Sequence, residues 1–228
     1  MFTSKRIFAV AMGLFALTGC AHRQLSADSL SDVRRLAVVV RAIPGPRVAV
    51  ATADAREHRV YPTLSPSEAD KQLQEVLAKQ VTVFELEERI RAELLKRMPA
   101  VPPWTTSMPP ADVATALQSL LVVDRTTPLD LKALRAAGAD AVLELRVTGW
   151  GVAVKSKAGL YLQGQGRLYS LPSESGIWSD SLDTDLAVDP EVEAVDAVAL
   201  KNGGFREAIK VLVDRLVARI GPELSGAP

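Results

Sequence analysis

The sequence predicts one α/β domain, a three-layer sandwich in which a single mixed sheet carries helices packed on its faces. The first observation is a change of hydrophobic period, from helical spacing in residues 65–98 to strict alternation from residue 141 onward. The second is a continuous apolar run at residues 36–40, typical of a strand buried on both faces. The third is a pair of turn-rich segments after residue 154, which indicates that the sheet ends in an antiparallel three-strand meander.

Two short strands are predicted near the start of the domain. Residues 36–40 and 48–52 are both rich in β-branched residues. Residues 43–46, Ile-Pro-Gly-Pro, have the composition of a turn. We therefore expect the two strands to form a hairpin.

The clearest helix start lies at Ser65, because Pro66 suits the first helical position and Glu68 completes a capping box. We expect the helix to lie on the sheet, with a break at the strand-like residues 81–84. Its apolar face carries Leu73, Leu77, Val81, Phe84, Ile90, Leu94 and Met98. Its opposite face is expected to be solvated and carries Glu85, Glu87, Glu88, Arg89, Arg91 and Glu93.

The density of prolines in residues 99–110 excludes a helix or a central strand there. We expect a second helix at residues 111–121, a strand starting at 121–123, and a short helix that begins at Thr127 and stops at Gly138. The remaining elements are predicted as strands at 141–154, 160–171 and 177–186, a helix at 189–200, and a final amphipathic helix that Gly221 and Pro222 end.

The chain begins with the features of a secretory leader. Lys5 and Arg6 precede a short apolar stretch, residues 7–17, which is far shorter than the roughly 20 residues that span a bilayer. The next residues, Leu17-Thr18-Gly19-Cys20, closely resemble the lipobox of bacterial lipoprotein precursors. The resemblance implies cleavage between Gly19 and Cys20 and a diacylglycerol and fatty acyl chains such as palmitate on Cys20. The alternative is an ordinary free or buried thiol.

This organisation divides the chain into four parts: a cleaved signal peptide (1–19), a lipidated flexible tether (20–34), one globular domain (35–222) and a disordered tail (223–228). In Gram-negative lipoproteins an aspartate after the cysteine favours the inner membrane. Because Ala21 stands there, the resemblance implies an outer-membrane anchor that faces the periplasm. The single cysteine leaves none for disulfides.

Charge argues against nucleic acid as a partner. The chain has 27 basic and 27 acidic side chains, and loss of Lys5 and Arg6 with the leader leaves 25 against 27, or about −2. Such a balance lacks the basic footprint that neutralises phosphates.

The second half resembles a group of bacterial envelope lipoproteins. The segment Ala137-Gly138-Ala139-Asp140 leads into Val147-Thr148-Gly149-Trp150, and Gly176-Ile177-Trp178 follows a turn. This layout, over about residues 128–220, resembles the curli-secretion lipoprotein, the Pel exopolysaccharide lipoprotein and the N-terminal domain of the Tol-Pal β-propeller protein. The resemblance implies a non-catalytic part of an envelope assembly, often an oligomer, with other envelope proteins as partners.

Catalytic and metal-binding patterns are weak, and we expect no enzyme activity, no metal site and no cofactor other than the lipid. Gly164-Gln165-Gly166 lies within a strand, where glycine usually marks a close approach and not a phosphate loop. His22 and His58 are far apart in the chain. The acidic stretch at residues 180–189 suits a solvated edge strand better than a pair of glycosidase carboxylates.

Three aromatic residues, Trp150, Tyr161 and Trp178, are candidates for a partner surface. The alternative is that the tryptophans cover the core beneath helices. We expect a membrane-anchored, non-catalytic structural or accessory subunit of an envelope assembly or export system. A second hypothesis is a lipoprotein that binds a glycan or peptidoglycan through an exposed aromatic patch.

Overall fold

The computed structural model describes residue 25 and residues 33–53, 60–97, 106–117 and 127–224. The predicted leader, Cys20, the strand predicted at 121–123 and the last four residues lie outside this set. Core packing reaches beyond both predicted domain boundaries, since Val33 and Leu224 are fully buried. Leu25, within the predicted tether, also packs against the core.

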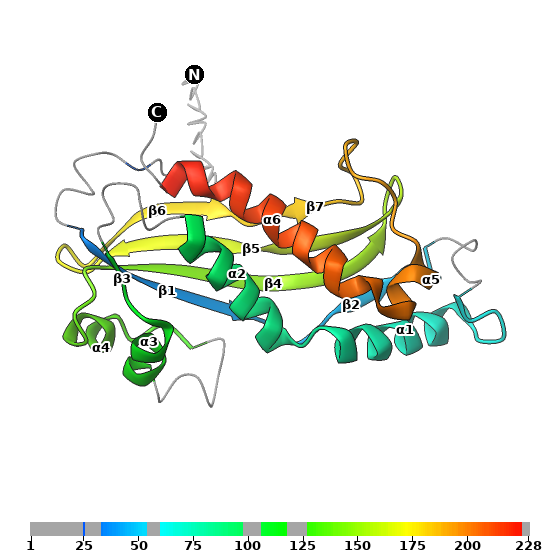
Figure 1. Ribbon diagram of the computed structural model, residues 1–228, viewed down its shortest axis with the longest axis horizontal. Coiled ribbons are helices and arrows are strands. Elements are labelled where there is room, and N and C mark those ends of the chain that lie inside the picture. Colours follow the sequence, from blue (N-terminus) through cyan, green and yellow to red (C-terminus); the bar gives the residue numbers. More distant parts are fainter. Residues whose placement is uncertain (1–24, 26–32, 54–59, 98–105, 118–126, 225–228) are drawn as a thin grey trace, which may run out of the picture.

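A mixed seven-stranded sheet forms the centre of the molecule, as predicted (Figure 1). Its strands are β1 (Arg35–Ala42), β2 (Arg47–Ala49), β3 (Thr106–Ser107), β4 (Ala141–Val154), β5 (Ala158–Ser170), β6 (Ser175–Ser181) and β7 (Thr184–Asp185). The strand order is β3-β1-β4-β5-β6, with β2 paired to β4 and β7 paired to β5. The antiparallel meander of β4, β5 and β6 confirms the prediction made from the alternating pattern.

The predicted hairpin between the first two strands is wrong. β1 runs parallel to the first half of β4, from Leu36 opposite Ala141 to Ala42 opposite Val147. β2 runs parallel to the second half of β4, so the two strands lie end to end on the same side of it. Ile43 donates a backbone hydrogen bond to Val147 at 3.0 Å, which holds the connecting segment against β4 instead of letting it fold back on β1.

Helices cover one face of the sheet along its length and the other face near one end. The elements of the first layer are α1 (Pro66–Gln80), α2 (Val83–Arg97) and α6 (Phe205–Leu224), of which α2 and α6 cross the sheet in Figure 1. The opposite layer contains α3 (Pro110–Ala116) and α4 (Leu131–Ala136). The predicted break at residues 81–84 separates α1 from α2, and Glu68 accepts from the backbone N–H of Ser65 at 3.0 Å as the capping box requires.

Two helix boundaries, the start of α4 and the end of α6, differ from the prediction. α4 begins at Leu131 and not near Thr127, because the Asp130 side chain caps it by accepting from the Ala133 N–H at 2.9 Å. Its predicted end is confirmed at Gly138, which has a φ of 90°. α6 continues past Pro222 because its buried stripe extends to Leu224.

The predicted helix at residues 189–200 is wrong except for its last turn, because the described residues 189–196 are not helical. Asp189 accepts from the N–H of Glu191 at 2.9 Å, which makes a local turn. The ammonium of Lys157 donates to the carbonyls of Asp189 and Val192 and holds this segment in an irregular path. Helical structure starts only at α5 (Ala197–Ala199). The next segment, η3 (Leu200–Gly204), contains a kink at Asn202 and Gly203, after which α6 begins.

One buried carboxylate fixes the turn after β2 to α1. Asp70 is only 6% exposed and accepts from the backbone N–H groups of Val50, Ala51 and Thr52 at 2.8–3.1 Å. It also accepts from the Thr52 hydroxyl at 2.6 Å. Four donors therefore converge on one carboxylate, and each would be left without its acceptor if that group were removed.

We predict that Asp70→Ala lowers the free energy of unfolding by about 3 kcal/mol, because buried donors to a charged acceptor lose their partner. Chemical denaturation measures the change. Glu75→Ala, at an exposed position of the same helix, is the control and should change stability by less than about 0.5 kcal/mol. Equal effects of the two substitutions would contradict the anchoring role of Asp70.

Candidate binding groove at the sheet edge

Among the described residues, strand β1 borders the sheet and is paired on its outer side only at its first residues. In the described chain the strand on that side is β3, which pairs with Arg35 and Leu36 alone. Met108 makes a last backbone hydrogen bond to Leu36 at 2.8 Å. The next residues, Pro109 and Pro110, have no N–H to continue the ladder, and the chain turns into α3.

The outer backbone groups of β1 belong to its even-numbered residues. The Leu36 carbonyl accepts from Met108, and the Ala42 N–H donates to Glu87 at 2.8 Å, both away from β4. Successive residues of a strand direct their N–H and C=O groups to alternate sides. Val38 and Val40 therefore direct theirs outward as well, at a point where no described strand pairs with them.

A groove with a volume of about 390 Å³ runs along this edge. Its floor is residues 38–41 of β1, one wall is α2 and the other is α3. The two walls belong to opposite faces of the sheet, since α2 packs beside Val38 and Val40 and α3 packs beside Val39. The wall residues are Phe84, Glu87, Glu88, Arg91, Pro110, Ala111, Val113, Ala114 and Leu117.

Two residues of α2 differ from the sequence prediction. Phe84 was expected in the buried face but is 62% exposed, the most exposed large hydrophobic side chain among the described residues. Glu87 was expected in solvent but is only 8% exposed. The break before Val83 starts a new helix whose buried stripe is Leu86, Glu87, Ile90 and Leu94. Phe84 therefore lies on the groove instead of in the core.

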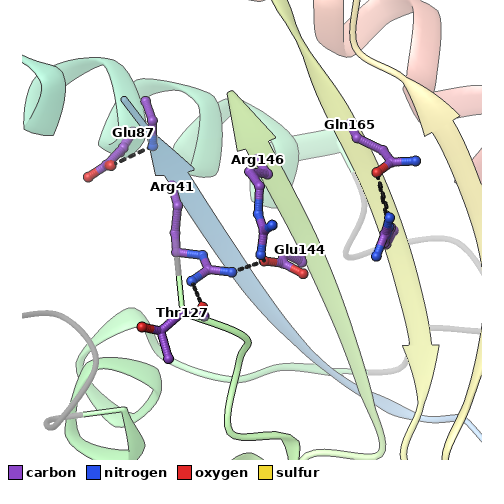
Figure 2. A network of polar contacts seen from close by, with 8 residues as sticks. Arg41, Glu87, Thr127, Glu144, Arg146 and Gln165 are labelled. Atoms are coloured by element: carbon purple, nitrogen blue, oxygen red, sulfur yellow. Dashed lines mark hydrogen bonds and ion pairs between the residues drawn. The ribbon is translucent and has the colours of Figure 1, made fainter. Parts of the chain in front are cut away.

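Arg41, at one end of the groove, belongs to a buried polar network (Figure 2). Its guanidinium forms an ion pair with Glu144, which also accepts from Arg146 at 3.2 Å. Its Nη1 donates to the Thr127 carbonyl at 2.5 Å. Arg41 and Glu144 are 7% and 5% exposed, yet Nε of Arg41 has no hydrogen-bond partner among the described residues.

The predicted aromatic surface does not form at Trp150 and Trp178, which are each 1% exposed. Trp150 stacks on Phe205 with ring centroids 6.4 Å apart, and its indole N–H donates to the Ile43 carbonyl. The Trp178 indole N–H donates to Glu223 at 3.2 Å. The alternative, that both tryptophans cover the core, is confirmed. Tyr161 remains partly exposed, and burial raises its pKa above the ordinary value.

The other singled-out positions serve local structure where they are described. A Cβ at Gly166 would lie 2.8 Å from the Trp178 ring, which confirms that the glycine permits a close approach. Asp183 accepts from the N–H of Gly164, and Asp185 pairs with Lys155 at 2.5 Å. Gly19, Cys20, His22 and His58 lie outside the described residues.

No group of three or more His, Cys, Asp or Glu side chains in the described part of the chain is placed to hold a metal ion. None of the described helices combines the length and the apolar character that crossing a bilayer requires.

Comparison with known proteins finds solved structures of low similarity. No protein-family model matches the chain. No curated protein matches it either. The hypothetical protein CT253 from Chlamydia trachomatis has a TM-score of 0.44 at 11% identity, over 85% of this chain and 96% of that chain. Lipoprotein GNA1162 from Neisseria meningitidis has a TM-score of 0.38 at 13% identity, over 82% and 96%.

A PelC dodecamer from Paraburkholderia phytofirmans has a TM-score of 0.37 at 12% identity, over 87% of this chain and 91% of that chain. The structural neighbours thus include a lipoprotein and a PelC, each at a TM-score below 0.5.

Sequence patterns did not indicate the groove with its lining residues Phe84 and Glu87. The ion pair of the groove residue Arg41 with Glu144 was also not predicted. A signal for the last two was present, because Arg41 follows the apolar run of one predicted strand and Glu144 interrupts the apolar positions of another. Charges at such positions usually pair when they are buried. No sequence pattern indicates the groove, since its floor in β1 and its walls in α2 and α3 come from segments that are far apart in the chain.

We predict that Glu144→Ala lowers the free energy of unfolding by about 3–5 kcal/mol, because it leaves the buried Arg41 guanidinium without its carboxylate. The control is Arg146→Ala, which removes the partly exposed member of the same network and should cost less than about 1 kcal/mol. Denaturant titration of the two variants distinguishes them. A Glu144 variant as stable as the Arg146 variant would show that the buried pair contributes nothing.

Proposed function

We propose that this protein is a membrane-anchored envelope lipoprotein that acts as a non-catalytic accessory subunit of an envelope assembly or export system. The anchor is a covalent lipid on Cys20, and the domain faces the periplasm from the outer membrane. Support for the anchor is the basic, apolar and Leu-Thr-Gly-Cys succession of residues 5–20. Two or three acyl chains on one residue hold a protein far longer than the marginal binding of one chain.

The observation that carries the accessory role is the apolar groove along β1. Contiguous apolar surface beside an exposed large side chain such as Phe84 is typical of a protein-binding site. The charged groups of the groove are engaged in structural contacts: Glu87 with the Ala42 N–H, Glu88 with Arg91, and Arg41 with Glu144. This arrangement supports binding of another protein over acid–base chemistry.

The glycan-binding hypothesis lacks the surface on which it depended. It required Trp150 and Trp178 to face solvent beside Tyr161, and both tryptophans are buried with their indole N–H groups bonded inside the protein. Tyr161 alone is a weak platform, because sugar recognition by stacking needs an exposed ring face.

We predict that Cys20→Ser abolishes labelling by a fatty-acid analogue in cells, leaves an uncleaved precursor and moves the protein out of the detergent phase. The reason is that serine lacks the nucleophilic thiolate to which lipid is attached. Ser26→Ala, in the same predicted tether, is the control and should be labelled and cleaved like the parent protein. Unchanged detergent partitioning of the Cys20 variant would contradict the anchor.

A further inference from the structure

We propose that the groove along β1 binds an extended apolar segment of a partner protein, which adds to the sheet as a strand beside Val38 and Val40. The inference deepens the proposed accessory function by assigning the binding mode and the chemistry of the partner segment. Strand addition supplies affinity through backbone hydrogen bonds and selectivity through pockets for alternate side chains.

The free edge presents the hydrogen-bonding pattern that an extended peptide complements. Val38 and Val40 each direct one N–H and one C=O group outward. They lie between Leu36, which pairs with β3, and Ala42, whose N–H is bonded to Glu87. From Val38 to Ala42 the edge extends about 13 Å at roughly 3.3 Å per residue, the length of four or five strand residues. Val38 and Val40 are 2% and 3% exposed, so their outward groups gain little from bulk water.

The buried guanidinium of Arg41 marks one end of the groove and is held by contacts within the chain. Its Nη1 and Nη2 are bonded, whereas Nε, in a side chain more than nine-tenths buried at the groove, has no partner in the described chain. A buried donor without an acceptor costs free energy.

The walls specify an apolar, uncharged segment. Alternate side chains of an added strand would lie against α2, beside the exposed Phe84, and against α3, beside Ala114. The two arginines and two glutamates that line the groove balance in charge and already make contacts to this chain. A charged segment would therefore find no opposite charge in excess.

The geometry favours a segment of another protein over the edge of a second copy. The floor of the groove lies between α2 on one face of the sheet and α3 on the other. A single strand fits between two such walls, whereas the edge of a complete folded sheet would bring its own flanking helices into the same space. The occupant is consequently an extended segment that stands clear of its own fold.

The test uses the full protein in detergent with a synthetic peptide, acetyl-Lys-Val-Thr-Val-Thr-Val-Lys-amide, whose last lysine carries a fluorophore. Its five central residues are uncharged and span the groove, and the two lysines lie outside this segment and keep the peptide soluble. Anisotropy measures binding, and hydrogen exchange measures protection of the Val38 and Val40 amides. We expect saturable binding and at least tenfold slower exchange of both amides with the peptide. The matched peptide with every valine and threonine amide N-methylated keeps the side chains but donates no hydrogen bonds from them, and it should bind at least tenfold more weakly.

Protein variants locate the site. Ala114→Arg places a long side chain in the groove, and Phe84→Ala removes the exposed apolar rim, so each should weaken binding at least tenfold. Val211→Ala, an exposed hydrophobic position on α6, and Thr115→Arg, on α3 but outside the groove lining, are the matched controls and should bind like the parent protein.

Four results would overturn the proposal: no saturable binding up to millimolar peptide, equal binding of the N-methylated peptide, full binding by Ala114→Arg, or protected Val38 and Val40 amides without peptide. In the last case, protection that is independent of protein concentration would mean that the chain covers its own edge, and protection that rises with concentration would identify a second copy. Lipid attachment is measured separately, so a failed anchor and a failed groove are distinguishable.

Discussion

Pairing along β4 is the constraint on which the rest of the structure depends. Its 14 residues contact β1 and β2 in parallel on one side and β5 in antiparallel register on the other. Because one strand is shared by both halves of the chain, residues of β1 and β4 pack together in the hydrophobic cluster on each face of the sheet. The same pairing places β1 at the border of the sheet, with its outer backbone groups directed away from β4. The groove is therefore a consequence of the topology, and the proposed binding mode follows from it.

Much of the architecture could be predicted from local pattern. The capping box at Ser65, the alternation after Ala141 and the glycine stop at Gly138 are short-range signals, and the structure confirms each of them. The pairing of β2 could not be predicted in this way. Residues 43–46 have the composition of a hairpin turn, but the hydrogen bond from Ile43 to Val147 depends on a strand about a hundred residues away.

The candidate site was harder to predict, because the sequence does not show which aromatic side chains are exposed and which are buried. Trp150 and Trp178 are equally suited to a surface patch or to a core. Their burial distinguishes the two, together with the stacking of Trp150 on Phe205 and the indole bonds to Ile43 and Glu223. Phe84 shows the reverse case. Its spacing continues the stripe of α1, but the break before α2 moves the stripe to Leu86 and leaves Phe84 on the groove.

The proposed lipid anchor, Cys20, lies outside the described residues. The described domain presents an apolar groove along β1. Mass spectrometry of the N-terminal peptide of protein purified from its native membranes tests the central claim most directly. The account predicts a chain that begins at Cys20 and carries a diacylglyceryl group on its sulfur. A chain that begins at another residue, or Cys20 with an unmodified thiol, would contradict it.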